Sequence, residues 1–183
     1  MLFNIASVEA ISKILTNPTW DILVLFFFLA LGFFYGITAG IKRLLSMLFA
    51  IYVSILLFIN FKYLDFFVEG KSILEVFFFR LVIFLILIVL LCIIFNKIVF
   101  SELDKNKKWT RAIILSLLLS FLEIGLLISA VFQFLPAKGL FSFSPIVEKF
   151  FASEETFFWW LALPLIALFF IIVKQPKKKI NRP

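Results

Sequence analysis

The sequence predicts an all-α protein, a polytopic membrane helical bundle of about five transmembrane helices with short amphipathic interfacial helices. Of its 183 residues, 64% are hydrophobic and only 16% are charged, whereas a soluble domain carries about 25% charged residues. The apolar residues form runs of about 20, the length of helix that crosses a bilayer. Basic residues gather between these runs, as they do at the cytoplasmic ends of membrane helices. Together these observations exclude a soluble globular protein.

The first predicted span covers residues 20–40. Asn17 and Pro18 precede it as cap and first-turn residue, and Asp21 lies where a negative charge suits the positive end of the helix dipole. Residues 1–19 carry apolar residues near helical spacing with polar residues between them, which predicts an amphipathic helix in the outer membrane interface. The same stretch has neither a basic segment nor a small-residue cleavage site, so it is not expected to be a signal peptide.

Three glycines at four-residue spacing, Gly32, Gly36 and Gly40, lie in the second half of this span. Each glycine costs a helix roughly 1 kcal/mol relative to alanine. Three together are expected only where bare backbone lets another helix come close, as small residues do between membrane helices. We therefore predict that all three pack against a neighbouring helix. A lipid, peptide or pore surface is the alternative for the same face.

Lys42 and Arg43 come directly after the glycines and one further residue. A single helix through both cations would bury them, so the sequence predicts a tight turn here and a second span over residues 44–61, which forms a hairpin with the first. The third predicted span covers residues 76–95. Arg80 lies near one end of it and can extend to the membrane surface, and the single cysteine within it is expected to serve packing.

The fourth predicted span, residues 112–135, completes a four-helix membrane core that covers residues 20–135. Ser116, Ser120 and Glu123 fall on one stripe of this helix. A carboxyl near mid-membrane is costly and has to face protein or water. We expect a protonated Glu123 to form a hydrogen bond with a neighbouring helix. Proton or ion handling by the same carboxyl is one alternative, and a misplaced span is another.

The fifth predicted span, residues 157–173, has two tryptophans at one end and a basic tail at the other. Residues 157–183 are therefore predicted to form a transmembrane helix with an aromatic belt, followed by a cytoplasmic tail. The outer segment before it, residues 136–156, has a helix start at Ser144 and Pro145. Its apolar residues lie opposite its charged ones, which predicts a second amphipathic piece on the outer face.

The distribution of basic residues predicts the orientation of the chain. Lys and Arg number 12 on the side that holds the first hairpin turn and 6 on the other side. The positive-inside rule places the side with 12 in the cytoplasm, so the N-terminus is expected outside the cell and the C-terminus inside. The net charge of +7 is then explained by loops that contact anionic lipids at the cytoplasmic face. No nucleic-acid partner is expected.

The chemistry that the sequence allows is sparse. The chain has no histidine and one cysteine, so it cannot build a Cys/His zinc site or a histidine-based catalytic group. Its three aspartates are expected near or outside the ends of the spans, which leaves no pair of acids at membrane depth. We therefore predict no enzyme activity, no catalytic residue, no metal site and no cofactor. The expected partners are the lipid bilayer, other membrane proteins and a second copy of the chain.

The order of Asp21, the glycine series and Arg43, followed by a leucine-rich second span, resembles the colicin V production protein family of small bacterial inner-membrane proteins. Weaker similarity continues to about residue 151 and includes the segments RAIILSLLLS and SFSPIVEKFF. Two features depart from the family pattern. The family has a glycine-rich start to the fourth span with an arginine in it, where this chain has Ser116 and Ser120. The fifth span is an addition to the four-helix core.

The resemblance implies a non-enzymatic protein of the bacterial cytoplasmic membrane with a role in peptide-toxin production or export, or in envelope homeostasis. Two other classes stay open from the residues alone. A small transporter subunit or ion-conducting protein would use Glu123 in a polar bundle interior, and a holin-like pore former is the third reading. A transporter should place Glu123, Ser116 and Ser120 against a cavity, with Arg43 or Asn60 in reach. A scaffold should bury the three against a helix.

Overall fold

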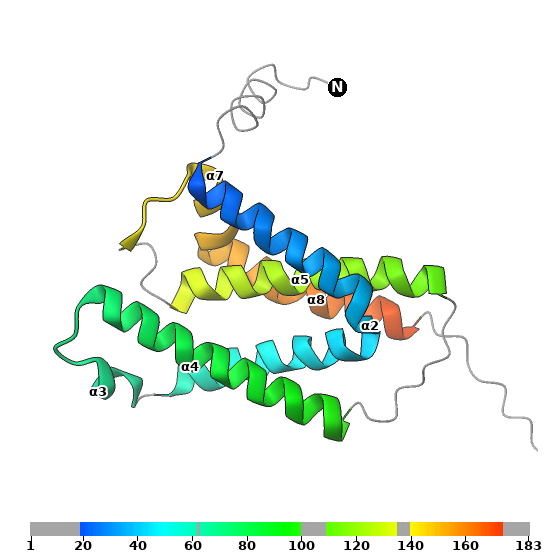
Figure 1. The fold of residues 1–183 in the computed structure, drawn as a ribbon, viewed down its shortest axis with the longest axis horizontal. Coiled ribbons are helices and arrows are strands. Elements are labelled where there is room, and N and C mark those ends of the chain that lie inside the picture. Colours follow the sequence, from blue (N-terminus) through cyan, green and yellow to red (C-terminus); the bar gives the residue numbers. More distant parts are fainter. Residues whose placement is uncertain (1–18, 62, 100–108, 135–139, 174–183) are drawn as a thin grey trace, which may run out of the picture.

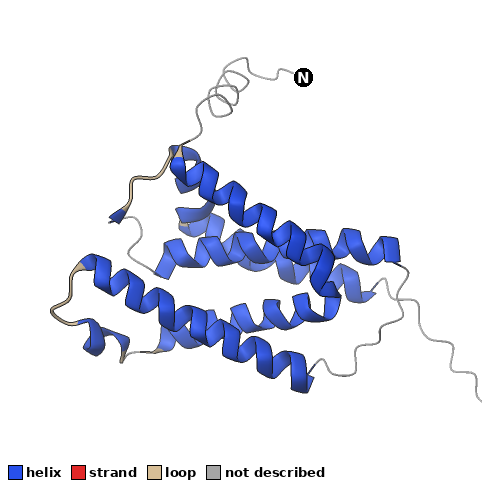
Figure 2. Cartoon of the chain, viewed as in Figure 1, coloured by secondary structure: helices blue, strands red, loops and turns tan. Residues whose placement is uncertain are grey.

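The computed structural model describes residues 19–61, 63–99, 109–134 and 140–173. Within these ranges the chain forms helices joined by loops and turns, without a strand (Figure 2). The long helices lie side by side in one bundle (Figure 1). The predicted all-α fold class is therefore confirmed. The amphipathic helix predicted for residues 1–19 lies outside the described residues except for Thr19, and so does the basic tail after residue 173.

Helix α2, Trp20–Asn60, folds back on itself at Gly40, where the backbone takes φ 74° and ψ 161°. This region of conformational space is essentially restricted to glycine. Its N-terminal arm, residues 20–39, and its C-terminal arm, residues 41–60, run in opposite directions (Figure 1). The predicted hairpin is thus present, but the turn predicted at Lys42 and Arg43 is wrong by two residues. The chain reverses where the backbone can adopt a positive φ, and both cations lie in the first turn of the C-terminal arm.

A short helix, α3 (Leu64–Val68), leads from α2 to α4 (Ile73–Ile94). Helix α4 begins with a capping box, in which the Ser72 side chain accepts a hydrogen bond from the Glu75 backbone N–H and the Glu75 carboxylate accepts one from the Ser72 N–H. This cap starts the helix three residues before the predicted span. Arg80 forms an ion pair with Asp65 at 2.8 Å, which joins α3 to α4. A π-helical turn, η1 (Phe95–Val99), continues α4.

The second half of the fold consists of α5 (Trp109–Phe134), α7 (Pro145–Val147), η2 (Glu148–Ala152) and α8 (Glu154–Val173). The helix start predicted at Ser144 and Pro145 is present, because the Ser144 side chain caps the Val147 N–H and Pro145 occupies the first turn. On the predicted apolar side Val147 and Phe151 are buried, while Ile146 and Phe150 stay exposed. The segment Pro145–Ala152 lies at 55° to Glu154–Phe169.

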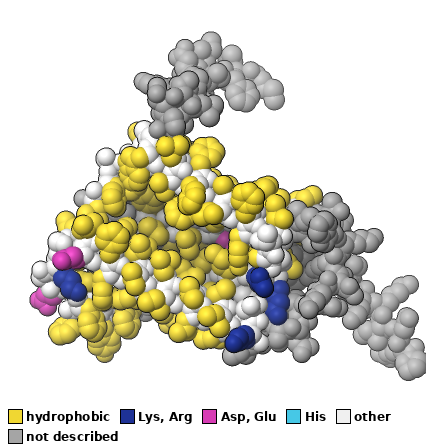
Figure 3. Space-filling view, in the orientation of Figure 1, with side chains coloured by type: hydrophobic (Ala, Val, Ile, Leu, Met, Phe, Trp, Pro, Cys, Tyr) yellow, Lys and Arg dark blue, Asp and Glu magenta, His cyan; other side chains and the backbone are white. Residues whose placement is uncertain are grey.

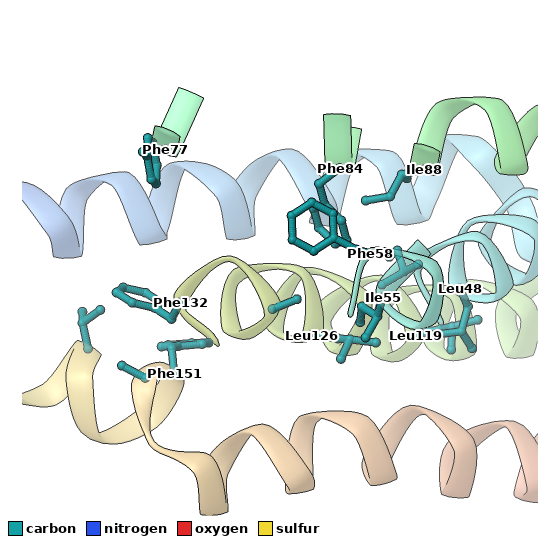
Figure 4. Close-up of a cluster of buried hydrophobic side chains, with 14 of the residues drawn as sticks. Leu48, Ile55, Phe58, Phe77, Phe84, Ile88, Leu119, Leu126, Phe132 and Phe151 are labelled. Atoms are coloured by element: carbon teal, nitrogen blue, oxygen red, sulfur yellow. The ribbon is translucent and has the colours of Figure 1, made fainter. Parts of the chain in front are cut away.

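Helix α5 is the centre of the bundle and contacts α2, α8 and η2. Leu119 and Leu126 on α5 pack with Leu48 and Ile55 from the C-terminal arm of α2 (Figure 4). At one end of this core, the ring of Phe58 lies 5.4 Å from that of Phe84 on α4 and 6.3 Å from that of Phe134 on α5. These contacts hold α4 and α5 on either side of the C-terminal arm.

The described helices are consistent with a membrane protein. Three of them, Trp20–Asn60, Ile73–Lys97 and Ile114–Phe134, are long and apolar enough to cross a membrane, and the bent pair α7–η2 with α8 makes a fourth candidate if it is one span. Hydrophobic side chains cover most of the face in Figure 3, and most charged side chains lie near two opposite ends of it. The five-span count itself stays a prediction, in which α2 supplies the first two spans.

Candidate functional site

Gly36 lies where the N-terminal arm of α2 comes close to α5. A Cβ atom added at this glycine would overlap the Ser120 hydroxyl and would lie 3.1 Å from the Ser116 backbone carbonyl. At Gly32, one turn earlier, an added Cβ would overlap the end of the Ile124 side chain and lie 3.7 Å from the Ser120 carbonyl. Two of the three predicted glycines therefore face a neighbouring helix, and α5 is that helix.

Gly40 does not belong to this contact, contrary to the prediction. A Cβ atom added there would meet no other atom within 4 Å, and the residue is exposed. Its position in the four-residue series misled the prediction because the series assumes one continuous helix. The helix ends here, and the glycine is needed for its positive φ rather than for packing.

A second close approach, not predicted from the sequence, involves Gly125 on α5. A Cβ atom added there would overlap the ring of Trp160 on α8. This ring is held in place, because its Nε1–H donates a hydrogen bond of 2.8 Å to the Phe150 carbonyl and its face stacks on Phe151 with centroids 5.3 Å apart. A glycine in the middle of a predicted span was the available signal, and the same helix cost that applied to Gly36 applied to it.

The predicted polar stripe of α5 is buried. Ser116, Ser120 and Glu123 expose 3%, 2% and 1% of their surface. The Ser120 hydroxyl donates a hydrogen bond of 3.1 Å to the Leu117 carbonyl of its own helix. Both carboxyl oxygens of Glu123 are inaccessible and have no hydrogen-bond partner. The predicted hydrogen bond from Glu123 to a neighbouring helix is therefore not present in the described part of the chain.

No described basic side chain forms an ion pair with Glu123. Among the described residues the single ion pair is the one between Arg80 and Asp65. An unpaired carboxylate in such a place would be strongly unfavourable. At this position the Glu123 carboxyl needs either a bound proton or a neighbouring cation to compensate its negative charge.

The two remaining candidate polar residues lie apart from the stripe. Asp21, in the first turn of α2 as predicted, is only 4% exposed. Its Oδ2 accepts a hydrogen bond of 2.6 Å from the Ser144 backbone N–H, which ties the start of α2 to the start of α7. Arg43 is exposed near the Gly40 turn. Neither residue completes a cluster with Glu123, and Asn60 bonds the Leu56 carbonyl of its own helix.

A groove of about 370 Å³ runs between the N-terminal arm of α2, α4 and α5. Its lining is hydrophobic apart from Asp21, and Phe141, Phe143 and Val147 close one end. The remaining lining residues are Trp20, Val24, Leu25 and Phe28 on α2, Phe77, Leu81, Phe84 and Leu85 on α4, and Leu127, Ile128, Val131 and Phe132 on α5. Ser116, Ser120 and Glu123 do not line it. A shallow surface hollow by Pro145 and Ser153 does not reach them either.

The described residues contain no group of three or more Cys, Asp or Glu side chains placed to hold a metal ion. Comparisons of the chain with protein-family models, with curated proteins and with solved structures found no match. The resemblance to the colicin V production protein family therefore depends on the sequence motif alone.

Proposed function

We propose that this chain is a non-enzymatic integral protein of the bacterial cytoplasmic membrane that acts as a scaffold, with a role in peptide-toxin production or export, or in envelope homeostasis. The burial of Ser116, Ser120 and Glu123 in the bundle is the observation that supports a scaffold. Gly36 packs directly on Ser116 and Ser120, and the Glu123 oxygens have no accessible surface. A pathway for a solute would need these groups to face an opening.

The proposed orientation has the N-terminus outside and the C-terminus in the cytoplasm. The described charges near the Gly40 turn are all basic, namely Lys42, Arg43 and Lys97, whereas the opposite end carries both signs. Such an asymmetry favours the Gly40 end as cytoplasmic, where anionic lipids would be its partners.

Cysteine labelling tests this orientation. In a Cys92→Ser background, we expect a membrane-impermeant maleimide added to intact cells to label Lys71→Cys and Lys149→Cys. We expect Lys97→Cys and Lys178→Cys to react only after the membrane is opened. Labelling of Lys178→Cys from outside would contradict the five-span arrangement, and labelling of Lys97→Cys would invert it.

A proton- or cation-handling protein is the second candidate, favoured by the Glu123 carboxyl that has no partner. The two functions differ in what Glu123→Gln does. For a scaffold, the variant should keep its stability within about 1 kcal/mol, the scale of hydrogen bonds between membrane helices, because Gln keeps the shape of the side chain. Liposomes that contain wild type, variant or no protein should then show the same internal pH change after an external acid pulse. A flux through wild type that the well-folded variant lacks would move the second candidate ahead.

A further inference from the structure

The groove opens between the N-terminal arm of α2 and α4. Its rim consists of exposed side chains, Val24 and Phe28 from α2 and Leu85 from α4, whereas Phe84 and Phe132 in its interior are buried. The neighbouring outer surfaces of both helices are also apolar, with Leu23 and Phe27 on α2 and Val82 and Ile86 on α4 exposed. The opening therefore faces the same medium as these surfaces. If the chain spans a membrane, as proposed above, that medium is lipid.

The groove has the length of part of one leaflet. Its lining covers residues 20–28 of α2 and 77–85 of α4, and eight residues of helix rise about 12 Å. The hydrocarbon core of a bilayer is about 30 Å thick. The groove therefore begins near the end of the bundle that carries Asp21 and stops short of the middle. An apolar trough of this kind suits one acyl chain that enters from the side.

The groove ends on an acidic group. Asp21 lines it, and although Oδ2 is bonded to the Ser144 N–H, Oδ1 is buried without a hydrogen bond of ordinary geometry. Two exposed acids lie next to lining residues at the same end. Glu148 directly follows Val147, and Glu75 comes two residues before Phe77. Among the described residues at this end, the bases Lys71, Arg80 and Lys149 are fewer than the acids, and Arg80 is paired with Asp65. The charge that complements this end is an ammonium group with N–H donors.

We propose that the groove binds one acyl chain of an outer-leaflet phospholipid of the phosphatidylethanolamine type, with the ammonium head group at Asp21. The lipid satisfies two separate features at once, the apolar trough and the acidic end. Phosphatidylcholine has the same chains and a cationic head but no N–H donor, so it is the discriminating competitor. Phosphatidylglycerol has the wrong charge for this end.

The test uses the full chain, purified in mild detergent, exposed to an equal mixture of the three phospholipids and analysed by native mass spectrometry. We expect about one phosphatidylethanolamine per chain, enriched about tenfold over phosphatidylcholine, the factor that one charge-assisted hydrogen bond supplies. Val24→Trp, which fills the groove, should remove this bound lipid. Leu23→Trp is the matched control, because Leu23 is the adjacent, exposed residue that does not line the groove, and it should retain the lipid.

Asp21→Asn separates the head group from the chain. Asn keeps an oxygen for the Ser144 N–H, so the fold should persist, but the preference for phosphatidylethanolamine over phosphatidylcholine should fall toward one. Equal retention of both lipids by wild type would overturn the proposal, as would a lipid-bound Val24→Trp variant or a lipid-free dimer that occupies the groove with a second copy. Recovery of the chain from the soluble fraction would overturn the proposed membrane function itself and this inference with it.

Discussion

Replacement of Gly36 by alanine is expected to destabilise the purified protein, although alanine is the better helix former. Removal of a helix glycine returns about 1 kcal/mol. Against this, the new Cβ would overlap the Ser120 hydroxyl and lie 3.1 Å from the Ser116 carbonyl, and backbone atoms of a packed helix cannot move aside singly. Overpacking of this kind costs about 1–3 kcal/mol. We expect a net loss of up to about 2 kcal/mol for alanine and a larger loss for leucine.

Gly32→Ala is the matched control for this change. Its Cβ would overlap only the end of the Ile124 side chain, which can rotate away, and the nearest backbone atom is 3.7 Å distant. We therefore expect Gly32→Ala to be close to neutral in a thermal unfolding experiment in detergent. A Gly36→Leu protein as stable as wild type, with an unchanged oligomer size, would show that this face contacts lipid rather than α5.

Replacement of Gly40 by alanine is expected to destabilise the hairpin through the backbone alone. No atom lies within 4 Å of an added Cβ, so there is no clash to consider. A non-glycine residue at φ 74° and ψ 161° is strained by about 1–3 kcal/mol. Alanine also favours the helical conformation that would join the two arms. We expect a lower unfolding temperature and weaker labelling of Lys71→Cys from outside the cell.

Ala39→Gly provides the control for Gly40→Ala. It changes a neighbouring residue that keeps helical backbone angles, so it should lose only the roughly 1 kcal/mol that a helix glycine costs and should leave the labelling of Lys71→Cys unchanged. Wild-type stability and labelling in Gly40→Ala would mean that the turn tolerates a side chain and that its position is set by other contacts.

The fold class and the hairpin could be predicted because both follow from local patterns. Hydrophobic runs gave the helices, and the glycine spacing gave the α2 surface that meets α5. The position of the turn could not be derived from the cost of burying Lys42 and Arg43, because both residues are tolerated at the start of a helix. Gly40 sets the turn, since only a glycine readily adopts the required positive φ. A spacing pattern also could not show that a Cβ at Gly36 would meet the Ser116 backbone carbonyl, because such a pattern does not distinguish glycine from other small residues.

The groove and its acidic end could not be predicted from the sequence. Its walls come from three helices that diverge, and divergence is a property of the packed bundle rather than of any one segment. The bond between Asp21 and Ser144 joins residues 123 positions apart, so no local spacing marks it. The contact of Gly125 with Trp160 has the same cause, although the glycine itself was visible. For Glu123 the sequence predicted a carboxyl that faces protein or water and bonds a neighbouring helix; the side chain is buried in protein, but its oxygens have no hydrogen-bond partner.

The central place of α5 has a consequence for biogenesis. Helix α5 carries an acid that lipid would not tolerate without cover, yet it is synthesised only after both arms of α2 and after α4. Synthesis proceeds from the N-terminus, so both arms of α2 and helix α4 have been made before α5 leaves the ribosome. Helix α8 follows and closes the other side by setting Trp160 on Gly125. In the proposed membrane protein, the order of helices along the chain thus allows the costly carboxyl to enter beside helices that have already been made rather than in bare lipid.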